Sequence, residues 1–138
     1  DYASDITQPP VIAWGAWLVY EKSGDKEFLK TVFENNKSFL LWCKSNRRKT
    51  EKELYSWHTN PELNNRCDES GMDNSPRFDE PILLQTIDFS CFMANEMRCM
   101  SAIAKVLNQP EDAAKYAALY QKMGDKINEL DFCKAFLP

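Results

Sequence analysis

Apolar and polar residues in the first third of the chain follow the pattern of two consecutive helices. The first run, 11–21, comes directly after Gln8-Pro9-Pro10, and proline suits the first turn of a helix because that turn does not need its N–H. Ser23-Gly24-Asp25 ends the run, and the Asp25 side chain can cap the next helix. That helix carries an apolar stripe with Lys and Glu between. The pattern predicts a helical hairpin over 11–48.

A second pair of helices is predicted over 83–130. The segment 83–107 is apolar around most of its circumference, which predicts a buried helix. Asn108-Gln109-Pro110 ends it, and proline followed by two acids opens an amphipathic helix, as the helix dipole favours. The first helix is also expected to be buried. Buried and amphipathic helices then alternate, as in a toroid of helices with an inner and an outer ring, and a plain four-helix bundle fits equally.

The segment 50–81 between the hairpins has no periodicity and is rich in Asn, Asp, Ser, Gly and Pro. A connection of this length is unusual in a compact domain, and long ordered loops often carry function. In a toroid, Gln8-Pro9-Pro10 and this loop would emerge at the same end, beside the start of the two inner helices. We therefore expect the unusual chemistry of the chain to converge there.

Composition narrows the class of protein. With 43% hydrophobic and 28% charged residues the chain is typical of one ordinary soluble domain, and no apolar run approaches the roughly 18 residues that cross a bilayer. A net charge of -4 argues against a nucleic-acid partner. The basic run Arg47-Arg48-Lys49 falls where a helix should end, and cations there complement the helix dipole. The first ten residues lack the features of a signal peptide, so the location stays open.

Neither a metal site nor a cofactor site is indicated. The five cysteines, at 43, 67, 91, 99 and 133, lack CxxC spacing and are expected to be mostly buried thiols. Cys91 and Cys99, eight residues apart, are expected on one helix face. His58, the single histidine, has no Cys or His partner nearby, and the acidic loop lacks the Gly and Glu positions of a calcium loop.

The run Asp68 to Glu80 contains five carboxylates and a single cation, Arg77. Dense like charges, and burial beside Met72 or Phe78, raise the pKa of a carboxyl group, which suits a proton donor. Glycoside hydrolysis by inversion needs one protonated carboxyl for the leaving oxygen and one carboxylate to activate water, roughly 6.5–9.5 Å apart. Composition alone does not say which acid would serve, and a solvated acidic turn is the alternative.

Four segments carry a family resemblance. The run ESGMDNSPRF at 69–78 is very similar to the ESGMDNSPR loop of glycoside hydrolase family 63 and its mannosylglycerate-hydrolase-like relatives, and more loosely to the trehalases. QPPVIAW at 8–14 resembles the family's QPPV-x-AW helix start, and LYSW at 54–57 resembles the segment ahead of the acid loop. IDFS at 87–90 resembles a VDLN helix start, from which Phe89 and Ser90 depart. The similarity covers about residues 5–130.

The resemblance implies an (α/α)6 toroid of six hairpins, of which this chain would form about a third, with Asp73 as the general acid. It implies inverting cleavage of an O-glycosidic bond, with α-linked glucose or mannose as the expected sugar and an oligosaccharide or small glycoside as substrate. The family's general base belongs to a segment downstream of the fourth helix. We therefore expect the isolated chain to be inactive, and to self-associate through inner-helix faces that the remainder of the domain would cover.

Six residues are candidates for contact with the sugar, and several have a structural alternative. The tryptophans could stack on a sugar or pack in the core; Arg77 could bind substrate or neutralise its neighbours; Gln8 could bind sugar or cap the first helix. The candidates are Gln8, Trp14, Trp57, Asn74, Arg77 and Asp88. A non-catalytic helical carbohydrate-binding or scaffold module is the alternative function.

Overall fold

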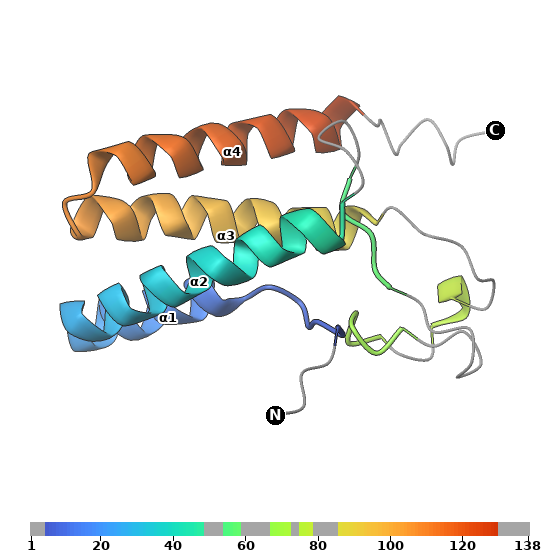
Figure 1. The fold of residues 1–138 in the computed structure, drawn as a ribbon, viewed down its shortest axis with the longest axis horizontal. Helices are drawn as coiled ribbons and strands as arrows, with labels where there is room; N and C mark the ends of the chain where they lie inside the picture. The colour runs from blue at the N-terminus through green and yellow to red at the C-terminus, as the bar shows by residue number, and fades with distance from the viewer. Residues whose placement is uncertain (1–4, 49–53, 59–66, 73–74, 79–85, 130–138) are drawn as a thin grey trace.

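The computed structural model describes residues 5–48, 54–58, 67–72, 75–78 and 86–129. Within these ranges the protein is all-α and contains no β-strand. Its helices are α1 (Ile12–Ser23), α2 (Lys26–Asn46), α3 (Ile87–Val106) and α4 (Pro110–Glu129), with a 3-10 turn, η2 (Pro76–Phe78). Figure 1 shows two helical hairpins, α1 with α2 and α3 with α4; α1 and α3 run in the same direction, and α1 begins beside the middle of α3. The predicted all-α class and its two hairpins are confirmed.

The turn inside each hairpin follows from its residues. Gly24 ends α1 in the left-handed conformation, with φ 69°, and its N–H donates to the carbonyl of Tyr20. Asp25 then caps α2 by accepting from the N–H of Phe28 at 2.9 Å. In the second turn Asn108 takes the left-handed conformation, with φ 56°, and Pro110 is the first residue of α4. Both turns lie where the sequence predicts them.

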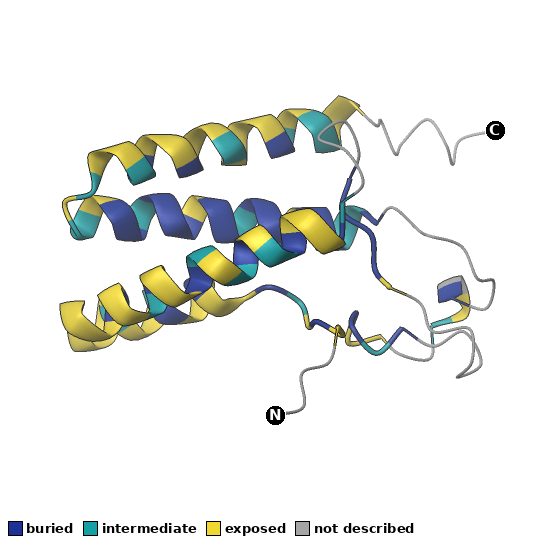
Figure 2. Ribbon diagram, in the orientation of Figure 1, coloured by how far each residue is buried: buried dark blue, intermediate teal, exposed yellow. Residues whose placement is uncertain are grey.

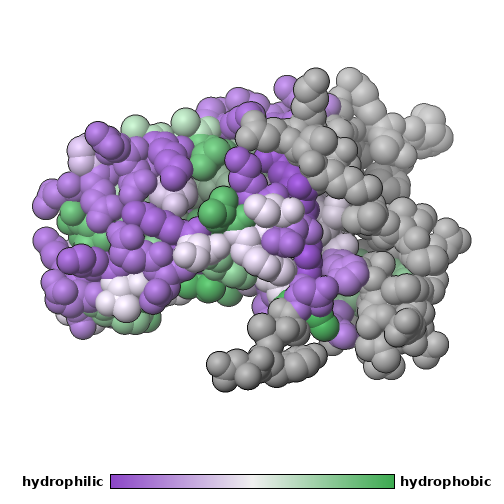
Figure 3. All heavy atoms as spheres, in the orientation of Figure 1, coloured by the Kyte–Doolittle hydropathy of each residue, from purple (hydrophilic) through white to green (hydrophobic). Residues whose placement is uncertain are grey.

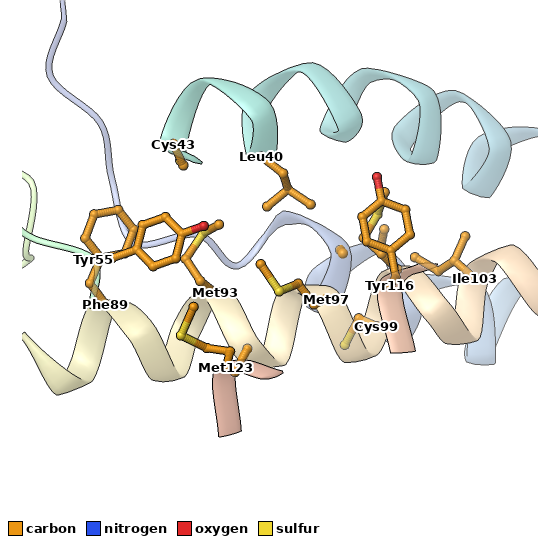
Figure 4. Close-up of a cluster of buried hydrophobic side chains, with 14 of the residues drawn as sticks. Leu40, Cys43, Tyr55, Phe89, Met93, Met97, Cys99, Ile103, Tyr116 and Met123 are labelled. Atoms are coloured by element: carbon orange, nitrogen blue, oxygen red, sulfur yellow. The ribbon is translucent and has the colours of Figure 1, made fainter. Parts of the chain in front are cut away.

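The hydrophobic core forms around α3, which packs against each of the other three helices. Its buried side chains meet those of α2 and α4, and Figure 4 shows methionines of α3 between Leu40 of α2 and Tyr116 and Met123 of α4. The ring of Tyr116 also meets Phe33 of α2 edge-on, with centroids 6.1 Å apart. The prediction of a buried third helix is therefore confirmed.

The first helix differs from its prediction. Only Ala13 and Ala16 are buried along α1, whereas Trp14, Leu18 and Val19 are between 43% and 49% exposed. The expectation of a buried α1 is wrong for this structure because α1 has only α2 and α3 to pack against in the described part. Figure 2 shows the contrast between the exposed α1 and the buried α3. The result is an apolar face that α2 and α3 leave exposed.

Helices α2 and α4 are amphipathic, as predicted, and an ion pair joins them. Lys37 of α2 donates to Asp112 of α4 at 2.7 Å and to Glu34 at 3.2 Å.

A hollow of about 350 Å³ lies beside this pair, with an apolar floor and several lysines around it. Figure 3 shows hydrophobic side chains among hydrophilic ones between α2 and α4, where this hollow lies. The hollow flanks the helices and is lined by residues of α2, α3 and α4 together with Arg48 and Tyr55. Among the described helices, none combines the length and the hydrophobicity of a membrane-spanning segment.

Candidate active site at the shared end of α1 and α3

Three segments far apart in the sequence meet at the end of the molecule where α2 ends and α3 begins (Figure 1). The side-chain amide of Gln8 donates to the carbonyl of Asp68 at 3.2 Å, and a Cβ at Gly71 would lie 4.0 Å from Cγ of Pro9. The N–H of Thr86, just before α3, donates to the carbonyl of Tyr55 at 2.9 Å. The predicted convergence of the N-terminal segment and the 50–81 loop is therefore confirmed for the described residues.

A buried carboxylate, Glu69, holds these segments together. Its side chain is 1% exposed and accepts from the backbone N–H groups of Thr7 and His58, each at 2.9 Å. Nε of Arg47 lies 3.0 Å from both of its oxygens, and Nη2 also donates to it. We call this arrangement the Glu69 clasp: Glu69 with Thr7, Arg47 and His58. It joins the N-terminal segment, the end of α2, the 54–58 segment and the acid loop.

The clasp corrects two sequence interpretations. Arg47 does stand at the C-cap of α2, but its guanidinium lies over the ring of Trp42 and pairs with Glu69 rather than only facing the helix dipole. Glu69 in turn does not belong to an acid cluster with a single cation, because Arg47 offsets its charge. Arg47 lies 22 residues earlier in the chain, so local spacing gave no sign of this pair.

Trp57 and Asp88 form a second fixed point, at the start of α3. The indole Nε1 of Trp57 donates to Oδ1 of Asp88 at 3.0 Å, and the same oxygen accepts the N–H of Phe89 at 2.8 Å. The Trp57 ring is completely buried and stacks on Phe89, with centroids 4.1 Å apart. A buried, stacked ring offers no open face to a sugar, so the geometry favours the core alternative for Trp57. Trp57 orients the half-buried Asp88.

The two departures from the family pattern at 87–90 both have structural partners. Phe89 supplies the surface on which Trp57 stacks. The hydroxyl of Ser90 donates to the carbonyl of Thr86 at 3.1 Å and accepts the N–H of Tyr55 at 3.0 Å. These side chains therefore attach the 54–58 segment to α3.

Glu96 is a second buried carboxylate, which the sequence analysis missed. It lies in the middle of α3 with no exposed surface, and it accepts from the N–H groups of Ala13 and Trp14 at 2.8 and 3.1 Å. Nδ2 of Asn36 donates to it at 2.9 Å. It caps α1 from outside, since Val11 at the N-cap has no capping side chain. The available signal was an acidic residue in the middle of a helix that is apolar around most of its circumference.

The remaining predicted site residues are placed as follows. Gln8 and Trp14 are exposed, and they belong to a segment attached to Glu69 at Thr7 and to Glu96 at Ala13. Arg77 lies in η2, and its side chain is not among the described ones. Asp73 and Asn74 lie outside the described residues.

The described parts of the acid loop are held by short-range hydrogen bonds. The hydroxyl of Ser70 donates to the carbonyl of Cys67 and accepts the N–H of Met72, both at 3.0 Å. The N–H of Ser75 donates to the carbonyl of Met72 at 2.9 Å. Phe78 is buried, whereas Met72 is 49% exposed. Of the two apolar neighbours named for the loop acids, Phe78 is the buried one.

The described cysteines and the possible metal ligands were compared with the expectations from the sequence. Cys43, Cys67 and Cys99 are buried thiols, as expected, and burial raises the pKa of each. Cys91 is exposed, so it does not share the face of Cys99, because eight residues along a helix do not close a whole number of turns. Within the described ranges, no group of three or more His, Cys, Asp or Glu side chains could hold a metal ion.

Comparison with known proteins gives a family and one relative. The model of the glycosyl hydrolase family 63 C-terminal domain matches residues 16–135. The chain is also similar to an uncharacterized protein of Borreliella burgdorferi, with 28% identity over 121 residues, which is 88% of this chain and 23% of that protein. The chain thus spans about a quarter of the length of this relative. No solved structure matches.

Proposed function

Because the chain belongs to glycosyl hydrolase family 63, we propose that it supplies the general acid, Asp73, to the inverting hydrolysis of an O-glycosidic bond. Asp73 gives its proton to the leaving oxygen while a second carboxylate activates water from the opposite face, the two held roughly 6.5–9.5 Å apart. The chain covers 23% of its relative's length, and the second carboxylate comes from a later part of such a longer protein.

The observation that carries this proposal is the Glu69 clasp. Glu69 opens the run that resembles the family's acid loop, and its carboxylate attaches that run to Thr7, Arg47 and His58. A solvated acidic turn needs no buried anchor of this kind. Binding and catalytic groups are commonly carried by loops that a rigid scaffold positions, and here the scaffold is the shared end of two helical hairpins.

The exposed face of α1 supports an (α/α)6 toroid as the complete architecture. Leu18 and Val19 stand on this face, and an inner helix of a toroid contacts protein on all sides. The two hairpins of this chain then form about a third of the ring. The further helices of the domain are the proposed partners of α1, and copies of the chain cover the same face when those helices are absent.

The substrate proposed is an oligosaccharide or small glycoside of α-linked glucose or mannose. Gln8 and Trp14 are exposed on a segment that two buried carboxylates hold, and Trp stacks readily on apolar sugar faces. Asp88 is oriented by Trp57. Asn74 and Arg77 belong to the acid loop and complete the proposed set of sugar contacts.

The test is the Asp73→Asn substitution in the full-length protein, assayed on α-linked gluco- and manno-oligosaccharides. Loss of a general acid is expected to lower turnover by about 10²–10⁴-fold, while oligosaccharide binding measured by calorimetry persists. Asp68→Asn, in the same loop, is the matched control and is expected to retain turnover. Near wild-type turnover in Asp73→Asn excludes the assignment. Binding without hydrolysis in the unmodified protein indicates instead the non-catalytic carbohydrate-binding module.

A further inference from the structure

We propose that Glu69 is the positioning residue of this site: through the clasp it fixes the loop that carries Asp73 and thereby sets where the proton donor stands. This inference rests on the proposed function, because it gives Glu69 a task only in a site where Asp73 is the acid. Nothing in the family match distinguishes Glu69 from the other acids of the loop.

Glu69 is unsuited to be the proton donor itself. Its oxygens already accept from two backbone N–H groups and from the Arg47 guanidinium, which nearly fills the roughly four acceptor sites of a carboxylate. A donor must reach the leaving oxygen, and Glu69 is 1% exposed. Glu69 therefore acts on the reaction through another residue.

The clasp determines the position of the loop because each of its partners belongs to a different segment. Thr7 lies ahead of α1, Arg47 ends α2, and His58 belongs to the segment attached to α3. On the other side of Glu69, Ser70 ties the loop to itself through Cys67 and Met72. Glu69 is thus the point where a locally bonded loop is attached to the helical scaffold.

Positioning matters to a general acid because proton transfer depends steeply on distance. The donor must come within hydrogen-bond reach of the leaving oxygen, and a displacement of about 1 Å can cost on the order of 10²-fold in rate. Supporting residues that lock such a group are therefore part of the site. Substituting Glu69 leaves Asp73 chemically intact but removes the attachment of its loop.

The experiment compares two substrates that differ in their need for a proton. In an α-linked disaccharide the leaving group is the second sugar, which would depart as a poorly stabilised alkoxide and therefore needs a proton from the acid. In the corresponding α-glycosyl fluoride the leaving group is fluoride, which departs without a proton. In the full-length protein we expect Glu69→Gln to lower kcat/KM for the disaccharide by about 10–100-fold and that for the fluoride by less than about 3-fold. Asp73→Asn is expected to show the same selective loss, in stronger form.

Glu96→Gln is the matched control for a purely structural effect. Glu96 is equally buried and likewise accepts backbone N–H groups, but it belongs to α3 and holds α1 rather than the acid loop. Its substitution is expected to lower the rates on both substrates by the same factor. Rates are expressed per folded molecule, with the folded fraction measured by circular dichroism.

The outcomes separate this inference from the proposed function. Equal losses on both substrates in Glu69→Gln, beside a selective loss in Asp73→Asn, overturn the positioning role and leave the proposed function standing. Equal losses in Asp73→Asn overturn the proposed function itself. If Glu69→Gln does not fold, the double variant Arg47→Met/Glu69→Gln removes the unpaired buried cation. The same two substrates are then compared in that variant.

Discussion

The indole of Trp57 stacks on the ring of Phe89 with centroids 4.1 Å apart and an interplanar angle of 16°. The same indole donates to Asp88, so one buried side chain joins the 54–58 segment to the first turn of α3. The Trp57 side chain therefore helps to hold Asp88 in its conformation, and substitutions of Trp57 measure how much this contact contributes to stability.

Trp57 is expected to contribute strongly to the stability of the chain. Trp57→Ala removes a fully buried ring and is expected to lower the free energy of unfolding by about 3–5 kcal/mol. Trp57→Phe keeps an aromatic ring but loses the bond to Asp88, with an expected cost of about 1–3 kcal/mol. Urea denaturation measures both. Trp14→Phe, at an exposed position, should change the value by less than about 0.5 kcal/mol, and an equal effect at the two positions contradicts the packing described.

Glu96→Gln tests the capping of α1 from outside. The amide of glutamine cannot accept from all of Ala13, Trp14 and Asn36, and an unpaired buried donor is expected to cost about 1–3 kcal/mol. Hydrogen exchange of the Ala13 and Trp14 amides should accelerate more than that of amides in α4. Glu21→Gln, at an exposed position of α1, serves as the control. Unchanged exchange at Ala13 rules out the cap.

The hairpin turns and the two buried carboxylates, Glu69 and Glu96, show which parts of the fold and the site the sequence could predict. The hairpin turns at Gly24 and Pro110 are set by local chemistry, a left-handed glycine and a proline at the first helical position, so spacing predicted them. Glu96 meets Ala13 across 83 positions and Glu69 meets Arg47 across 22. Such pairs have no local pattern. The exposure of α1 was equally beyond periodicity, because periodicity marks an apolar face without saying what covers it.

Alkaline pH should destabilise the chain through its buried thiols. Burial raises the pKa of Cys43 from 9.0 to about 12, and it raises those of Cys67 and Cys99 as well. Below pH 9 the folded and unfolded states are both protonated at Cys43. Between pH 9 and 12 only the unfolded thiol ionises. Ionisation of Cys43 therefore lowers the free energy of unfolding by about 1.4 kcal/mol per pH unit in this range.

Denaturation under reducing conditions from pH 7 to pH 10.5 measures this loss. Cys43→Ala should show a shallower decline above pH 9 than the unmodified chain, even though its stability at pH 7 is lower. Cys91→Ala removes an exposed thiol whose pKa is also raised, by partial burial and by the nearby charge of Asp88. The shift is smaller than that of Cys43, so this control should flatten the decline less than Cys43→Ala does. Parallel curves for Cys43→Ala and the unmodified chain would assign the alkaline effect to other groups.

The exposed face of α1 should drive self-association of the isolated chain. Leu18 and Val19 are each 49% exposed, and contiguous apolar patches of this kind favour association. Leu18→Lys combined with Val19→Lys is expected to shift the chain toward monomer, as measured by sedimentation velocity. Leu41→Lys replaces an apolar residue that is 64% exposed on α2 and should leave the association unchanged. If Leu41→Lys alone yields monomer, the association surface lies on α2.

The attachment of the N-terminal segment also fixes an order of events in folding. Thr7 is held by a carboxylate 62 residues later, and the start of α1 by one 82 to 83 residues later. A chain emerging from the ribosome therefore has its first hairpin before it has the groups that cap and seat that hairpin. Until residue 96 has been made, α1 keeps unsatisfied amides at its start. The end of the molecule proposed for catalysis thus lacks the group that seats α1 until residue 96 has been synthesised.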